Sequence, residues 1–158
     1  MLLRNLNTND HSGSSTLAEL NDGLPTIGAL ARLCGRAISG ETTPIEKLSE
    51  EAKSILALGK QRGTFEIRCN KDAFESSQRF LAVCVELTDD KYLTLLDKSN
   101  PRVTLKFLDA FRELCQSGLI MHHTQRDFSL THSGFDAADE FDPSQFSELT
   151  DFAQEAEH

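Results

Sequence analysis

The sequence predicts an α+β domain that is mostly helical, with a small antiparallel sheet and extra helices at both ends. Apolar residues recur at helical spacing in several long segments of the 158-residue chain, whereas alternation of apolar and polar residues is confined to short ones. Apolar residues make up 39% of the chain, and a domain of this length buries roughly 70% of the surface of its unfolded chain. We therefore expect a folded domain.

The N-terminal part is expected to hold a flexible arm followed by two helices. Residues 1–23 are polar and predict the arm, and apolar residues at helical spacing predict a helix over 25–39. A second helix is predicted over 44–61. Thr43 would cap it, and Glu46 would complete a capping box.

The middle of the chain contains one clear strand and one ambiguous segment. Residues 64–69 alternate and predict a half-buried strand. Residues 72–87 fit a helix capped by Asp72, but the apolar, partly β-branched run 80–87 also fits a strand; we favour the helix because the segment is long. A short helix is predicted over 89–97.

The second half carries the best marked elements. Asn100 and Pro101 begin a helix over 101–117, and Gly118 followed by an apolar residue predicts a Schellman-type ending. Two short strands within 120–131 then form a β-hairpin.

Two further helices are expected at the end of the chain. Thr131 would cap a helix over 132–141, and an acidic helix rich in phenylalanine would follow over 142–158. The predicted organisation is therefore the arm 1–23, a domain over 24–141 and the C-terminal helix.

The order of these elements resembles a winged helix-turn-helix domain over roughly half of the chain. The resemblance lies in the helix 101–117, the run Gly118-Leu119-Ile120, the hairpin, and the motif Leu130-Thr131-x-x-Gly134 before the next helix. Helices 89–97 and 101–117 would form the helix-turn-helix pair, and the hairpin 120–131 would be the wing. The resemblance is one of fold and names no specific family.

The net charge of −9 is located at the C-terminal end. All 16 Lys and Arg residues lie in residues 1–126, and nine acidic residues without a basic one lie in 127–158. A uniformly acidic surface would repel nucleic acid. Because the rest of the chain is neutral and residues 98–126 are basic, the net charge alone does not exclude DNA binding.

The first functional hypothesis is a non-enzymatic interaction or regulatory module that binds a protein partner or a second copy of itself. It rests on phenylalanines that alternate with acidic residues near the C-terminus. These side chains either pack on the domain or on a second copy, or form a docking or autoinhibitory segment that covers the basic region 98–126. The candidate residues are Phe141, Phe146, Leu149 and Phe152.

The alternative is a DNA-binding transcriptional regulator. In winged helices the first turns of the recognition helix contact base edges and the wing contacts phosphates. The candidate residues are Arg102, Thr104 and Lys106 on the helix and Arg126 at the tip of the hairpin.

An enzymatic function is not expected, because the sequence contains no nucleophile elbow, phosphate-binding glycine loop or dinucleotide fingerprint. We also expect no cofactor, no small-molecule substrate and no metal. His122 and His123 are adjacent on a strand and should face opposite sides, and the carboxylates of Asp136, Asp139 and Glu140 lack a calcium-loop pattern.

The location expected from the sequence is the cytoplasm. The four cysteines include no Cys-x-x-Cys pair and have apolar neighbours, which favours reduced core residues. No apolar run reaches the ~18 residues of a membrane span, and the first residues lack the apolar core of a signal peptide.

Overall fold

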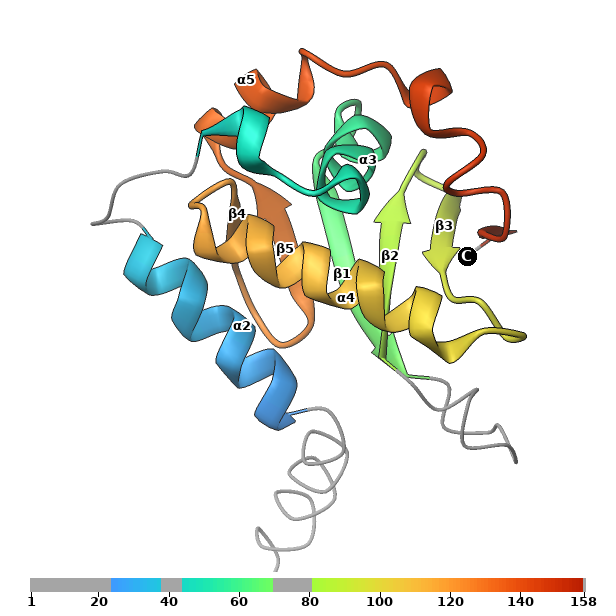
Figure 1. The fold of residues 1–158 in the computed structure, drawn as a ribbon. Helices are drawn as coiled ribbons and strands as arrows, with labels where there is room; N and C mark the ends of the chain where they lie inside the picture. Colours follow the sequence, from blue (N-terminus) through green and yellow to red (C-terminus); the bar gives the residue numbers. More distant parts are fainter. Residues whose placement is uncertain (1–23, 38–43, 70–80, 158) are drawn as a thin grey trace, which may run out of the picture.

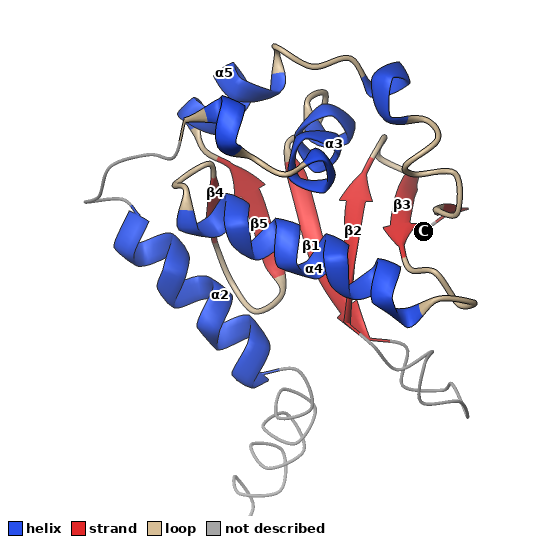
Figure 2. Cartoon of the chain, viewed as in Figure 1, coloured by secondary structure: helices blue, strands red, loops and turns tan. Residues whose placement is uncertain are grey.

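The computed structural model describes residues 24–37, 44–69 and 81–157. These residues form an α+β fold in which helices pack on one face of a six-stranded antiparallel sheet (Figure 1, Figure 2). The helical elements are α2 (Leu24–Ala37), η1 (Ile45–Lys47), α3 (Glu50–Gly59), α4 (Pro101–Gln116), α5 (His132–Ala138) and η3 (Pro143–Phe146). The strands are β1 (Thr64–Cys69), β2 (Leu81–Glu86), β3 (Lys91–Leu95), β4 (Ile120–His122), β5 (Asp127–Leu130) and β6 (Gln154–Glu157).

The sheet has the order β4-β5-β1-β2-β3-β6, and its face toward the helices is part of the hydrophobic core. The register pairs Phe65 with Val85, and both side chains are at most 1% exposed. Ile67, Val83 and Leu95 continue this buried face. Helix α4 crosses in front of β1 and β2 in Figure 1, so the apolar stripe of the helix and the apolar face of the sheet form one core.

The structure confirms the predicted helix α2, the strand β1, the helix α4 and the hairpin of β4 and β5. The C-terminal end of α4 is the expected Schellman motif. Gly118 adopts a φ of 75°, the amide of Leu119 donates to the carbonyl of Leu114 at 3.1 Å, and the amide of Gly118 donates to Cys115 at 3.3 Å. The chain therefore leaves α4 directly into β4.

The predicted helix over 44–61 begins later than expected. Its first turn is the separate 3-10 turn η1, and Leu48 is extended, with φ −66° and ψ 144°. Helix α3 starts after Ser49, whose hydroxyl accepts a hydrogen bond from the amide of Ala52 at 3.2 Å. The predicted cap Thr43 lies outside the described residues.

The helix predicted over 89–97 is wrong, because this segment contains the strand β3. Leu93 and Leu95 pair with residues of the buried face of β2, and Tyr92 and Thr94 face the opposite side. Side chains in this segment thus point alternately to the two faces of the sheet. The sequence does not show this alternation clearly, because leucines are clustered there. Without this helix, the described residues contain no helix-turn-helix pair ahead of α4.

The helix favoured for 72–87 is also wrong over 81–86, where the strand alternative is confirmed as β2. Residues 72–80 lie outside the described residues. Strand β2 lies between β1 and β3, and its four central residues are buried. A central strand of this kind shows a continuous apolar run, which periodicity does not distinguish from a buried helix.

The C-terminal segment differs most from its prediction. Helix α5 ends at Ala138 rather than at residue 141, and the helix expected over 142–158 is absent. Asp142 caps only the short turn η3, and residues Gln154–Glu157 form β6, which pairs with β3 at the edge of the sheet. The mostly helical domain with two or three strands is therefore corrected to an α+β fold with a six-stranded sheet.

Candidate interaction surface

A groove runs along the surface between α2 and α4. It consists of two hollows, of about 530 Å³ and about 360 Å³, which share Ala29, Asp109 and Arg112 as lining residues and so form one concave surface. We call it the α2–α4 groove. Its apolar lining comes from Ala29, Leu30, Leu33 and Leu108.

The groove lies where α2 packs beside α4 (Figure 1), and α2 also contacts β4 at the edge of the sheet. Ile27, Leu30 and Cys34 lie on one stripe of α2, and each is at most 4% exposed. Leu33 on α2 and Leu108 on α4 lie next to this contact and stay half-buried. Apolar carbon is therefore present at the bottom of the groove and remains accessible from outside.

The rim of the groove is basic. Arg32 and Arg36 project from α2, which carries no acidic residue within Leu24–Ala37, and Arg112 projects from α4. Arg102 and Lys106 extend the basic surface along the first turns of α4, and both are exposed. The chain thus has a local basic surface despite its net charge of −9.

The two acidic residues of α4 are already engaged. Asp109 forms an exposed ion pair with Arg112 one turn away, and such a pair contributes only about 0–1 kcal/mol. The carboxylate of Glu113 accepts two hydrogen bonds from Ser49, one from its amide at 3.0 Å and one from its hydroxyl at 2.7 Å. Glu113 therefore connects α4 to the start of α3, and it balances the rim arginines only in part.

The residues predicted to contact DNA do not form one surface. Arg102 and Lys106 are exposed as expected, and Arg126 is half-buried in the turn between β4 and β5. Thr104 is 1% exposed and lies on the buried side of the helix, which is unfavourable for the predicted contact with DNA. Its hydroxyl accepts from the amide of Asp97 at 2.9 Å and holds the loop before α4.

The aromatic residues predicted to bind a protein partner pack within the chain. Phe146 is 6% exposed, and the ring of Phe152 lies 5.3 Å from that of Phe107 in an edge-to-face contact. Phe141 packs against Phe146 at 6.1 Å, and Leu149 contacts the core. This packing agrees with the first alternative for the C-terminal segment, in which its phenylalanines pack on the domain.

The acidic C-terminal segment does not line the groove. Every lining residue belongs to α2 or α4. The segment instead runs past α3 and ends as β6, next to β3 at the edge of the sheet (Figure 2). Within the described residues, the acidic segment therefore leaves the α2–α4 groove open, although its Phe152 packs on Phe107 of α4.

The face of the sheet opposite the helices carries polar side chains that pair with one another around the buried Cys84. Arg68 pairs with Glu66 at 2.7 Å and lies 4.2 Å above the ring of Tyr92. The hydrogen bond and charge of Glu66 raise the pKa of Arg68. Two shallow hollows of about 110 Å³ and about 310 Å³ flank this arginine. Because its charge is already paired, this face has less capacity for a charged partner than the α2–α4 groove.

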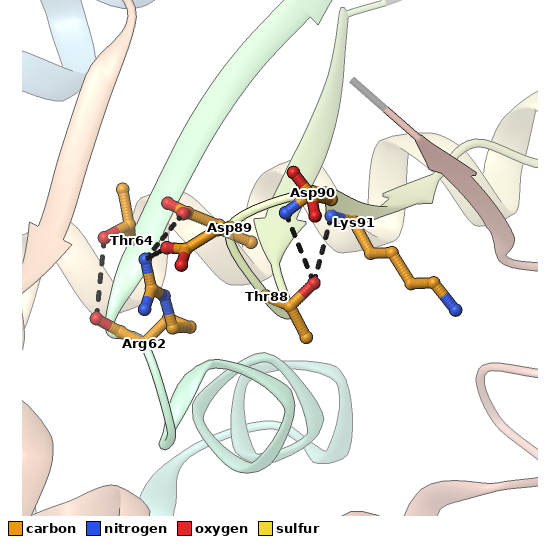
Figure 3. A network of polar contacts seen from close by, with 7 residues as sticks. Arg62, Thr64, Thr88, Asp89, Asp90 and Lys91 are labelled. Atoms are coloured by element: carbon orange, nitrogen blue, oxygen red, sulfur yellow. Dashed lines mark hydrogen bonds and ion pairs between the residues drawn. The ribbon is translucent and has the colours of Figure 1, made fainter.

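A second polar network stabilises one end of the sheet (Figure 3). Arg62 donates to Glu86 at 3.2 Å and also pairs with Asp89, and these two carboxylates raise the pKa of the guanidinium. The hydroxyl of Thr88 accepts from the amide of Lys91 at 3.1 Å. These contacts fix the turn between β2 and β3, which is a structural role.

The thiols beneath the groove are buried. Cys34 on α2 and Cys115 on α4 are 4% and 0% exposed. The neighbouring thiol of Cys34 and burial both raise the pKa of Cys115, and burial raises that of Cys84. All three are free thiols. The raised pKa values keep Cys115 and Cys84 protonated, which is unfavourable for a nucleophile, whereas the hydrogen bond with Cys115 lowers the pKa of Cys34.

No group of three or more His, Cys, Asp or Glu side chains within 24–37, 44–69 and 81–157 could hold a metal ion. The two adjacent histidines have separate partners, since the ring of His122 lies 5.0 Å from that of Phe128 and His123 shares a hydrogen bond with Ser129 at 2.6 Å.

Comparisons of the chain with protein-family models, with curated proteins and with solved structures find no match in any of the three. None of the helices in the described part of the chain combines the length and the apolar character that a bilayer crossing needs.

Sequence reasoning missed the two arginines of α2. The apolar stripe of residues 25–39 predicts a helix but carries no information about the opposite face of that helix. The available signal was the spacing of Arg32 and Arg36, one helical turn apart in a segment without acidic residues.

Proposed function

We propose that this chain is a non-enzymatic module that binds another protein in the α2–α4 groove. The observation that carries the proposal is an apolar floor combined with an arginine rim in one concave, exposed surface. Protein interfaces commonly have an apolar centre and a polar rim, and arginine is enriched in them. Nothing among the described residues favours an enzymatic function.

The apolar and the basic residues of the groove would contribute to binding in different ways. Leu33 and Leu108 offer half-buried apolar surface, whose further burial contributes roughly 25 cal/mol per Å². Arg32 and Arg112 would pair with carboxylates at the edge of the partner and would increase the rate of association. Loss of either component should weaken binding.

A photocrosslinking experiment tests the proposal. A photoreactive amino acid is placed at Ala29 inside the groove and, as a matched control, at Thr64 on the opposite face of the sheet. In extract of the source cells, we expect protease-sensitive adducts from position 29 and none of the same mass from position 64. Nuclease-sensitive adducts, or no adduct specific to position 29, would contradict the proposal.

DNA binding is the second candidate, favoured by the exposed Arg102 and Lys106 on the first turns of α4. The pairing of β5 with β1 beside the hairpin favours the resemblance to a winged helix, whereas the missing helix at 89–97 weakens it. Titration of duplex DNA at several salt concentrations tests this candidate. Binding at low salt that weakens when Arg102 and Lys106 are replaced by alanine would support it.

A further inference from the structure

We infer that the occupant of the α2–α4 groove is an acidic amphipathic helix of a different protein. This inference rests on the proposed function and specifies the chemistry of the partner. It depends on three properties of the groove: its length, the charge of its rim, and the positions of the acidic residues of this chain.

The length and shape of the groove fit a helix. Its lining on α2 extends from Thr26 to Arg36, which at about 1.5 Å per residue corresponds to roughly 15 Å, or almost three helical turns. A groove between two packed helices accepts a ridge of apolar side chains from a third helix, at spacings such as i, i+4 and i+7. The apolar floor provides the surface for that ridge.

The charge of the rim selects an acidic partner. Arg32 stands on one side of the groove and Arg112 on the other. Of the two acidic residues that line it, Asp109 pairs with Arg112, and Glu113 accepts hydrogen bonds from Ser49. Because the Asp109–Arg112 pair is exposed, with side chains 66% and 57% accessible, a carboxylate of the partner can take the place of Asp109 at little cost. Carboxylates that flank an apolar ridge would therefore meet arginines on both sides.

The chain itself does not provide this helix within its described residues. Its acidic C-terminal segment forms β6 and is hydrogen-bonded to β3. Helix α5 has only seven residues, and its exposed Phe135 packs over Gly63. A second copy that presented the same face would bring arginines against arginines, which disfavours a symmetric dimer through the groove.

Duplex DNA fits this surface less well than a helix. A protein that reads DNA inserts a convex helix into the major groove. Here the arginines of α2 and α4 face a concave surface with an apolar floor. Burial of that floor favours apolar side chains of a polypeptide rather than phosphates.

A designed peptide tests the inference with the full chain. The probe is a fluorescent amphipathic helix of about 18 residues with a ridge of leucines and flanking glutamates. One control peptide has lysine in place of every glutamate, and another keeps the composition but scrambles the order. Fluorescence anisotropy gives the affinity of each peptide. The glutamate and lysine peptides carry their leucines at the same helical spacing and form the apolar ridge, whereas the scrambled peptide does not.

Charge-reversal variants locate the binding site. Arg32→Glu and Arg112→Glu should each weaken binding of the acidic peptide by about tenfold, and the Arg32→Glu chain should bind the lysine peptide more tightly than the original chain does. Lys47→Glu makes the same change of net charge on the exposed turn η1 and should leave the affinity unchanged. Thermal unfolding confirms that each variant is folded.

The outcomes separate this inference from the function on which it rests. Equal binding of the glutamate and scrambled peptides, or equal effects of Lys47→Glu and Arg32→Glu, would overturn the inference. If a protein is crosslinked from position 29 but the glutamate peptide does not bind, the inference of an acidic helix is overturned and the proposed protein-binding function still stands. Self-association of the chain that Arg32→Glu abolishes would assign the groove to a second copy and also overturn the inference.

Discussion

At the scale of single residues, two glycines give opposite predictions for the same substitution. A methyl group on Gly134 would lie 2.0 Å from the carbonyl oxygen of Leu119, which is backbone and cannot move aside cheaply. A methyl group on Gly28, within α2, would have no neighbour within 4 Å. Gly134 therefore depends on a close approach of two segments, whereas Gly28 does not.

We predict that Gly134→Ala lowers the free energy of unfolding by about 1–3 kcal/mol or more. Gly28→Ala should raise it by about 0.5–1 kcal/mol, because alanine restricts the unfolded chain and favours the helix. Urea unfolding of both variants measures the two changes. If Gly28→Ala lowered the free energy of unfolding, or Gly134→Ala left it unchanged, the contacts described around these glycines would be contradicted.

The loop before α4 contains a carboxylate with a defined pH response. Asp97 accepts hydrogen bonds from the hydroxyl of Ser99 at 2.7 Å, from its amide at 2.9 Å and from the amide of Asn100 at 3.1 Å. These bonds, of which that from the Ser99 hydroxyl is the strongest cause, lower the pKa of Asp97 below its ordinary 3.8.

Because the folded-state pKa is lowered, the stability that Asp97 contributes is present above its unfolded-state pKa and is lost as the pH falls through the lower, folded-state value. An NMR titration should give a pKa below 3.8 for Asp97 in the native chain. Ser99→Ala should move that pKa upward, toward the ordinary value. A native pKa at or above 3.8 would refute this account of the loop.

At the scale of elements, α3 and α4 are connected through one side chain. Ser49 caps α3 and also donates twice to Glu113 of α4. Ser49→Ala should cost about 1 kcal/mol from the lost cap, and the bond to Glu113 adds to this.

A double-mutant cycle with Ser49→Ala and Glu113→Gln measures that connection. We expect a coupling free energy of about 1 kcal/mol, within the range for residues in contact. The exposed pair Lys53–Glu50, one turn apart in α3, serves as the control and should give only about 0.3 kcal/mol. A Ser49–Glu113 coupling no larger than this control would contradict the proposed connection.

The elements that sequence could predict are those whose ends carry local signals. Helix α4 has Pro101 at its start and Gly118 at its end, so its bounds follow from backbone conformation. Strand β3 has no comparable signal. Its leucines face the core only because β2 is its neighbour, and that pairing is a tertiary contact which the local pattern does not contain.

The candidate site was predictable in part. Arg102 and Lys106 are exposed as the helical pattern indicates, but Thr104 precedes Phe107 and Phe111 by three and seven positions and so lies on their buried stripe. The groove itself was not predictable, because it depends on how α2 packs beside α4. The sequence could at most indicate that Arg32 shares one face of α2 with another arginine.

At the scale of the whole molecule, the C-terminal segment is part of the fold. Phe146 is 6% exposed and Phe152 contacts the core, while the acidic residues around them face solvent. The net charge of −9 is therefore carried by a segment that packs on the domain and does not line the groove.

We predict that Phe146→Ala lowers the free energy of unfolding by about 3 kcal/mol, as for a buried phenylalanine. Leu105→Ala, at a side chain that is 40% exposed, should change it by no more than about 0.5 kcal/mol. Denaturant unfolding compares the two. Similar values would mean that the C-terminal segment does not pack on the domain as described.

The central claim is that a partner protein occupies the α2–α4 groove. Amide hydrogen exchange of the full chain, alone and with the protein recovered by crosslinking at position 29, tests its location most directly. We predict slower exchange in α2 and in the second half of α4, with no change in β3 and β6. Protection confined to β3 and β6, or to the hairpin of β4 and β5, would contradict the account.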